Sequence, residues 1–106
     1  MHPDDSLPAA SRDAIDRFVD ALWIEDGLSR LTLEAYRRDL RLYAAWLHAT
    51  ARRPLDSSRE ADLLGYMAAR HGHSRSTTSN RRLTVFKRYF RWALREHLIA
   101  ADPTVR

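Results

Sequence analysis

Apolar side chains recur at the spacing of an α-helix through most of this 106-residue sequence. Residues three or four positions apart lie on one face of a helix, and only three glycines and four prolines interrupt the pattern. No long run of β-branched residues indicates a strand. The sequence therefore predicts an all-α fold. Its clearest apolar stripe consists of Leu83, Phe86, Phe90 and Leu94.

Two helices are expected in the N-terminal half. The first is expected to begin at Ser11, whose side chain suits an N-cap, and to end at Gly27. Residues 1–10 are expected to form a disordered lead-in, because they contain two prolines and few apolar anchors. The second helix is expected from about Thr32 to about Ala49. The predicted buried stripes are Ile15, Phe18, Val19 and Leu22 in the first helix, and Leu33, Tyr36, Leu40, Tyr43, Ala44 and Leu47 in the second.

Two further helices are expected in the C-terminal half. A capping box of Ser57 and Glu60 predicts the start of the third helix, which ends near Gly72. The fourth helix begins within residues 76–79 and runs to about Ile99, ahead of a proline that cannot continue it. Short links between the four helices predict one compact bundle over residues 11–106. The buried side chains of the third helix are Met67 with either Leu63 or Leu64.

Charge is unevenly distributed along the chain. Residues 1–26 contain seven acidic and two basic residues, a net charge of −5, whereas the remainder carries a net charge of +9. Such a division indicates a basic part that meets an anionic partner and an acidic part that avoids it. Seventeen of the eighteen basic residues are arginine, a preference that codon bias in a GC-rich genome also explains. Codon bias does not explain where the charges lie.

The last predicted helix is basic on the side opposite its apolar stripe. A cationic stripe on a folded helix is suited to a polyanion, most commonly DNA. A solvated helix face whose arginines reflect codon bias is the competing interpretation. Trp92 borders the stripe, and we expect it to pack against a neighbouring element. The stripe consists of Arg81, Thr84, Arg88, Arg91 and Arg95.

Hydroxyl side chains stand at the expected starts of two helices. Thr32 opens the second helix, and Ser76, Thr77 and Thr78 open the fourth. Hydroxyls beside unpaired backbone N–H groups at the positive end of a helix can bind phosphate oxygens. Helix capping explains the same residues, and the two roles are compatible.

The sequence gives little support to catalysis, metal binding or membrane insertion. Cysteine is absent, and His71 and His73 lie in a loop without a carboxylate pair, so neither a metal site nor a cofactor is expected. Tyr36 and Tyr43 lie on an apolar stripe, which favours core packing over nucleophilic attack, and no catalytic residue is expected. Apolar runs are shorter than the ~20 residues of a membrane span. The N-terminus lacks a secretory core, so we expect a cytoplasmic protein.

Several motifs resemble a known family. They are DALW at 20–23, GLS at 27–29, TLEAYRRDL at 32–40, ST at 76–77, NRRLTVFKRYF at 80–90 and DP at 102–103. Over about residues 12–105 the sequence is similar to the N-terminal core-binding (SAM-like) domain of Xer-type tyrosine recombinases, in particular their XerD-like branch.

The resemblance implies an orthogonally packed four-helix domain that forms half of a clamp around duplex DNA at a recombination site. The clamp serves strand exchange such as chromosome dimer resolution. It implies a separate C-terminal catalytic domain, so this chain by itself is not expected to be an enzyme. The implied partners are double-stranded DNA and a XerC-like recombinase subunit, with neither a membrane nor a small-molecule substrate. The matching contact residues are Thr32, Arg37, Arg38, Ser76, Thr77, Arg81, Lys87 and Arg88, to which the charge pattern adds Arg41, Arg82 and Arg91.

Two other functions compete with DNA binding. A helical protein-interaction domain would dock a recombinase subunit or an acidic partner, and exposed Trp23 and Trp92 would suit that role. A helix-turn-helix regulator is the third alternative, but the sequence lacks a convincing short turn between two recognition-type helices.

Overall fold

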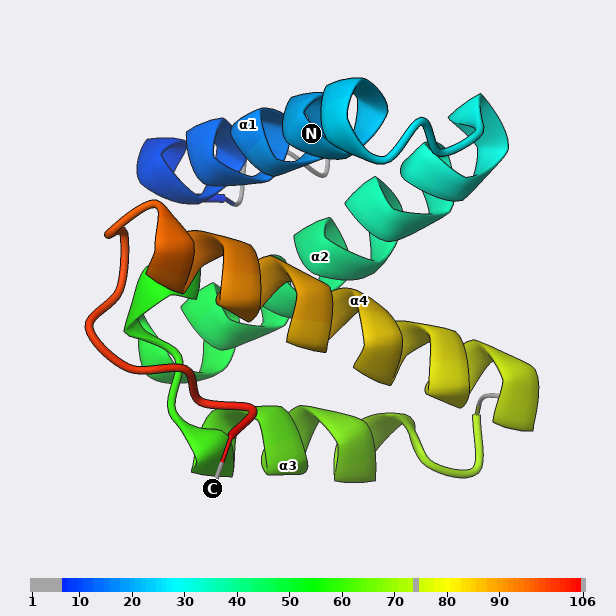
Figure 1. The fold of residues 1–106 in the computed structure, drawn as a ribbon. Helices are drawn as coiled ribbons and strands as arrows, with labels where there is room; N and C mark the ends of the chain where they lie inside the picture. Colours follow the sequence, from blue (N-terminus) through cyan, green and yellow to red (C-terminus); the bar gives the residue numbers. More distant parts are fainter. Residues whose placement is uncertain (1–6, 74, 106) are drawn as a thin grey trace. The chain divides into compact units, whose positions relative to one another are not determined.

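The computed structural model describes residues 7–73 and 75–105. These residues form four α-helices joined by short connections, with no strand among them (Figure 1). The all-α prediction is therefore confirmed for the described part of the chain. The chain divides into two compact units between Leu55 and Asp56, and each unit is described by itself.

The first unit contains α1 (Ala9–Glu25) and α2 (Arg30–Ala51), which pack against each other. Helix α1 begins two residues before Ser11, and Pro8 occupies the N-cap position. Ser11 is buried instead, and its Oγ accepts a hydrogen bond from the backbone N–H of Leu55 at 3.0 Å. The N-cap prediction for Ser11 is therefore wrong, because a tertiary contact uses its hydroxyl. Residues 1–6 of the expected lead-in lie outside the described residues.

The turn between α1 and α2 follows standard capping chemistry. Gly27 has a φ of +61°, the left-handed conformation expected of a residue just after a helix, as predicted. Ser29 is the N-cap of α2, and its Oγ accepts a hydrogen bond from the backbone N–H of Thr32 at 3.2 Å. Thr32 is therefore the third residue of α2 and does not open it. Every residue of the two predicted apolar stripes is buried.

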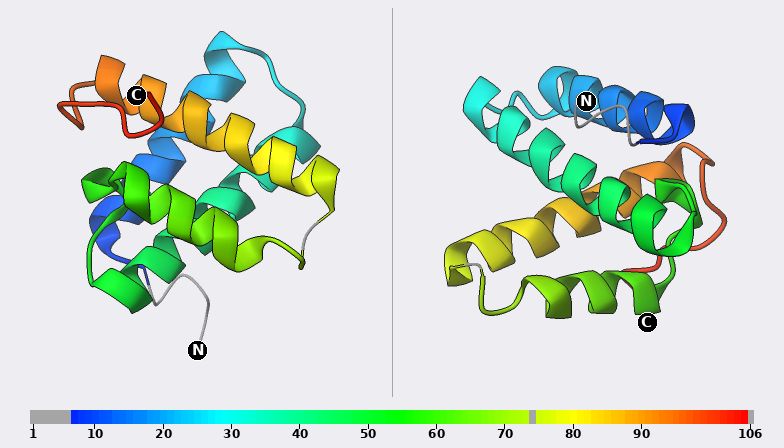
Figure 2. Two further views of the ribbon diagram at one scale, coloured as in Figure 1. Left: turned by 90° about the horizontal axis from the view of Figure 1, so that it is seen from below. Right: turned by 180° about the vertical axis from the view of Figure 1, so that it is seen from behind.

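The second unit contains α3 (Glu60–Arg70) and α4 (Ser76–Arg95), which lie side by side (Figure 1 and Figure 2). A short 3-10 helix, η2 (Leu55–Ser57), precedes α3. The predicted capping box is wrong, because Arg59 is the N-cap and its backbone N–H donates to Asp62 Oδ2 at 2.8 Å. Leu63 is buried and Leu64 is exposed, which settles the alternative that the sequence left open.

Helix α4 ends four residues earlier than predicted. His97 takes a left-handed φ of +61°, and its N–H donates to the carbonyl of Leu94 at 3.1 Å. The N–H of Leu98 donates to the carbonyl of Ala93 at 2.9 Å. These two bonds form a Schellman motif, which satisfies the last carbonyls of the helix. The helix therefore stops at this motif, well before Pro103.

The buried face of α4 is rotated from the predicted one. Leu83 and Leu94 are 43% and 40% exposed, so their assignment to the core is wrong. Larger aromatic side chains take their place, since they remove more apolar surface from water. Trp92 is buried, and its ring lies 5.8 Å from that of Tyr89 on the same helix, so its packing against a neighbouring element stays a prediction. The buried residues of α4 are Arg82, Val85, Phe86, Tyr89, Phe90, Trp92 and Ala93.

Candidate nucleic-acid interface

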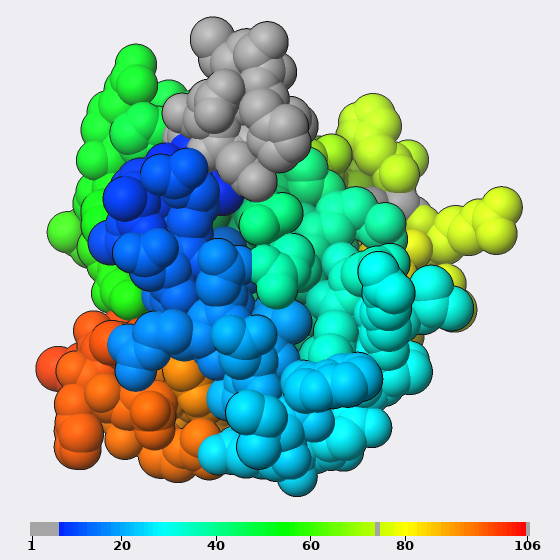
Figure 3. Space-filling model, turned by 90° about the horizontal axis from the view of Figure 1, so that it is seen from above, coloured from blue at the N-terminus to red at the C-terminus, as the bar shows by residue number. Residues whose placement is uncertain are grey.

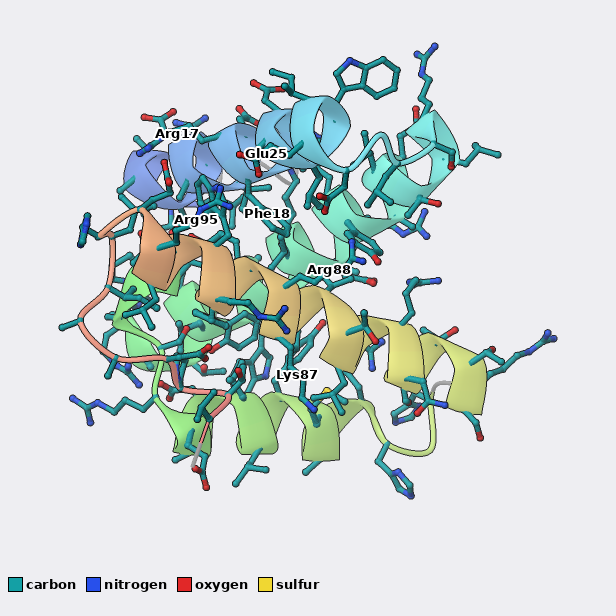
Figure 4. The ribbon with its side chains drawn as sticks, viewed as in Figure 1. Arg17, Phe18, Glu25, Lys87, Arg88 and Arg95 are labelled. Atoms are coloured by element: carbon teal, nitrogen blue, oxygen red, sulfur yellow. The ribbon has the colours of Figure 1, made fainter. Side chains whose placement is uncertain are left out.

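Helix α4 presents the clearest basic surface. Lys87 and Arg91, one helical turn apart, are both exposed, and neither forms an ion pair with any residue that the structure describes. Arg88 is half-buried and leaves α4 on a different side from Lys87 (Figure 4). We call the exposed pair Lys87 and Arg91 the α4 basic face. Of the predicted stripe, Thr84 and Arg95 are also exposed, whereas Arg81 is half-buried.

One carboxylate lies close to this face. A small hollow beside the helix is lined by Lys87, Arg91 and Asp102, among other residues. Asp102 Oδ1 accepts hydrogen bonds from the backbone N–H and the hydroxyl of Thr104, at 2.8 and 2.6 Å. Asp102 therefore orders the local turn at residues 102–104, and it forms no ion pair with Lys87 or Arg91.

The N-terminus of α4 is open to an anion. Its N-cap residue, Arg75, makes no side-chain capping hydrogen bond. Ser76 and Thr77 occupy the first two helical positions, and both are exposed. The first backbone N–H groups of a helix lack partners within the helix, and the helix dipole makes this end positive. Cationic Arg75 at the same end adds to the attraction.

Arg82 is placed differently from the other predicted contact residues. It is only 6% exposed, and its guanidinium carbon lies 5.6 Å from the centre of the Tyr66 ring on α3. Arg70 lies 5.5 Å from the same ring. This cation–π arrangement ties α4 to α3. The structure therefore uses Arg82 in packing, and its burial removes it from our proposed contact set.

Helix α2 carries a second set of cations in a different electrostatic state. Arg38 is exposed and has no ion-pair partner among the described residues. Arg37 and Arg41 are half-buried and both pair with Asp16 of α1. Figure 3 shows α1 lying directly against α2 in this unit. Thr32 is also half-buried, and its hydroxyl is hydrogen-bonded to that of Ser29 at 2.9 Å.

Sequence reasoning missed the part that Asp16 plays. Asp16 and Arg37 are 21 residues apart on different helices, so no local spacing connects them. Only the opposite charges of residues 1–26 and of the remaining chain gave a general signal that acid and base would pair.

The second unit also contains an apolar groove of about 190 Å³. Leu64 and Leu83 line it, which accounts for their exposure, and Lys87 stands among its lining residues. No cluster of three metal-ligating side chains occurs in the described ranges. None of the helices described is long and apolar enough for a transmembrane segment.

Comparison with known proteins identifies the class of this chain. Residues 15–97 match the family model "Phage integrase, N-terminal SAM-like domain". Because the match covers most of the chain, the protein belongs to this family, and its four helices agree with the all-α fold expected from the sequence.

The relatives found are tyrosine recombinases. The chain is 62% identical over 98 residues to the tyrosine recombinase XerD of Ralstonia nicotianae, a match that covers 92% of this chain and 32% of that protein. It is 39% identical to XerD of Pseudomonas putida and 43% identical to XerD of Pseudomonas aeruginosa. Those matches cover 94% and 87% of this chain, and 34% and 31% of the relatives. The chain thus spans about a third of these relatives, and no solved structure matches it significantly.

Proposed function

We propose that this chain is the DNA-binding module of a site-specific tyrosine recombinase and acts in the cytoplasm. The observation that carries the proposal is the α4 basic face, exposed on a chain whose relatives are tyrosine recombinases. Helices of this charge attract duplex DNA, because each phosphate contact releases condensed counterions. The module would hold the recombination site during strand exchange, such as the resolution of chromosome dimers, together with a XerC-like subunit.

The proposed contacts have distinct tasks. Lys87, Arg88 and Arg91 would neutralise phosphates along α4, and Arg81 extends the same helix surface toward its N-terminus. Ser76 and Thr77 would present hydroxyl and backbone donors to one further phosphate at the open helix end. On α2, Arg38 is the exposed cation, and Thr32 is the hydroxyl near the start of the helix. Arginine side chains that enter the major groove would read guanine edges.

The proposed role is binding, without strand cleavage by these residues. All four tyrosines of the chain are buried, so none is placed to attack a phosphate. A tyrosine nucleophile also needs cations around the scissile phosphate and a proton acceptor beside it. We therefore propose that this chain recognises DNA. Strand transfer would be carried out by the catalytic residues of a tyrosine recombinase.

Fluorescence anisotropy with a labelled duplex at several salt concentrations tests the proposal. Five phosphate contacts would give a slope of about −4 to −5 in a plot of log K against log salt concentration, at about −0.9 per phosphate. We expect micromolar affinity, because this module lacks the avidity of two linked DNA-binding halves. Absence of binding, or affinity that does not change with salt, would contradict DNA contact.

A second candidate function is docking of another recombinase subunit. Trp23, Ile24 and Leu31 are 59%, 78% and 79% exposed around the turn between α1 and α2. Exposed apolar clusters of this kind favour a protein partner. Trp92 no longer supports this function, because it is buried. Sedimentation velocity of the parent chain and of Trp23→Ala tests this function. If Trp23 belongs to a docking surface, the variant should lose self-association or subunit binding.

A further inference from the structure

Two arginines of α2 converge on one carboxylate oxygen. Arg37 donates a hydrogen bond from Nη1 to Asp16 Oδ1, and Arg41 Nη2 lies 3.8 Å from the same oxygen. The side chains of Arg37, Arg41 and Asp16 are 29%, 32% and 50% exposed. All three residues belong to the first unit. The carboxylate is thus more exposed than either arginine that holds it.

Two guanidinium groups directed at one oxygen form an arrangement that also binds phosphate. Arginine presents several donors in a planar fork, and charge-assisted bonds to phosphate oxygens are among its strongest contacts. Arg37 and Arg41 are spaced by four residues, so both project from one side of α2. Their geometry is therefore that of an anion site, which the Asp16 side chain fills.

Displacement of Asp16 by a phosphate carries a small cost. Ion pairs exposed to this extent contribute little to stability, because water screens them. Duplex DNA presents a dense line of phosphates whose binding to cations releases counterions, a gain that a single carboxylate cannot match. An exposed carboxylate can also turn into solvent once it is released.

We propose that Arg37 and Arg41 form a phosphate-binding site that Asp16 occupies in the free protein and leaves when a phosphate binds. The ligand is a phosphate group, supplied by duplex DNA or by inorganic phosphate. The part of the proposal that concerns DNA rests on the proposed function above. Asp16 is then an internal competitor that lowers the affinity of the module for DNA.

Removal of the competing charge tests the proposal. Asp16→Asn empties the site, and Asp13→Asn is its matched control, because Asp13 is exposed on the same helix and pairs with no described residue. Both variants remove one negative charge. We expect Asp16→Asn to bind a duplex up to about fivefold more tightly than Asp13→Asn, the equivalent of one surface ion pair. The salt slope should change by less than about 0.9, because a phosphate fills the site in both complexes.

A double variant identifies the residues responsible. Asp16→Asn combined with Arg37→Gln should lose the gain in affinity, because only one guanidinium remains at the site. Circular dichroism checks that each variant stays helical, and Asp16→Ser replaces Asp16→Asn if the latter unfolds. Equal affinity of Asp16→Asn and Asp13→Asn would overturn the proposal. Weaker binding by Asp16→Asn would overturn it too, since Asp16 would then orient the arginines.

Inorganic phosphate separates this inference from the proposed function. In ¹H–¹⁵N NMR titrations, Asp16→Asn should show saturable phosphate-dependent shifts around Arg37 and Arg41, and the double variant with Arg37→Gln should not. A phosphate response without duplex binding supports the anion site and contradicts the DNA-binding function. Duplex binding without any phosphate response in Asp16→Asn supports the function and overturns the site.

Discussion

Helices α2 and α4 both carry closely spaced arginines, yet the two helices differ in how much of that charge reaches solvent. On α2, Asp16 of the packed helix α1 pairs with Arg37 and Arg41, and Arg38 is left as the exposed cation of the three. On α4, Lys87 and Arg91 are exposed without an ion pair to any described residue. The neighbouring helix therefore decides what an arginine on the surface can do.

The starts of the two helices differ in the same sense. Helix α2 has a side-chain cap, in which Ser29 accepts a hydrogen bond from the N–H of Thr32, whereas α4 has none. At a capped helix start, a side chain accepts a hydrogen bond from a backbone N–H group. At an uncapped start, those N–H groups stay available to an external acceptor. Both differences support structural tasks for α2, and they favour α4 as the main DNA-contacting helix of our proposal.

The largest effect is expected from charge reversal on the α4 basic face. Lys87→Glu combined with Arg91→Glu should weaken duplex binding by at least about 100-fold at low salt, because two phosphate contacts become repulsive. Anisotropy titrations measure the affinity. The matched control is Arg52→Glu with Arg59→Glu, which changes the net charge equally at two exposed positions outside the proposed contacts. If both variants lost the same affinity for the duplex, net charge alone would explain the effect, and the position of the cations on α4 would not matter.

Removal of the buried arginine should affect stability and leave the salt slope unchanged. Arg82→Ala is expected to lower the free energy of unfolding by about 1–2 kcal/mol, since the cation–π contact with Tyr66 and the packed side chain are lost. Urea denaturation measures the change, and Arg91→Ala should stay within about 0.5 kcal/mol of the parent. If Arg82→Ala lowered the salt slope and left the stability unchanged, Arg82 would have to be counted among the DNA contacts.

The cap of α2 should matter for folding alone. Ser29→Ala is expected to lower the free energy of unfolding by about 1 kcal/mol, because the N–H of Thr32 loses its acceptor. Ser76→Ala at the uncapped start of α4 should change stability by less and should weaken DNA binding about two- to threefold. Thermal unfolding and anisotropy together measure both variants. The reverse pattern would show that the two helix starts have exchanged roles.

The smallest effect separates neighbouring arginines on α2. Arg38→Gln should reduce the magnitude of the salt slope by about 0.9, the contribution of one phosphate contact. Arg37→Gln should reduce it by less, because Asp16 offsets the charge of Arg37. Parallel salt titrations of the two variants provide the measurement. An equal reduction by both would indicate that Asp16 does not attenuate Arg37.

The helices were predictable because their signals are local. The spacing of Ile15, Phe18 and Leu22 directs them to one side of a helix whatever the rest of the chain does, and all three are buried. Gly27 ends a helix for an equally local reason, since a positive φ suits a residue without a Cβ atom. The basic character of the last helix was read from sequence in the same way.

The errors occurred where distant partners decide. Ser11 resembles an N-cap in sequence, but its Oγ accepts a hydrogen bond from the distant backbone N–H of Leu55. Leu83 resembles a core residue, but larger aromatic side chains fill the buried face of α4. A helical period defines a stripe, but several stripes fit α4, and packing selects among them. Arg82 belonged to the basic pattern in sequence and to the packed interior in space.

The amino-acid pattern alone established an all-α chain, the four helices of its described part and the basic character of the last one, since 3.6-residue periodicity and charge counts are properties of short segments. Tertiary structure alone decided which cations stay available. Whether an arginine meets Asp16, the ring of Tyr66 or water depends on side chains brought together from distant positions, and electrostatic energies change steeply over those few ångströms.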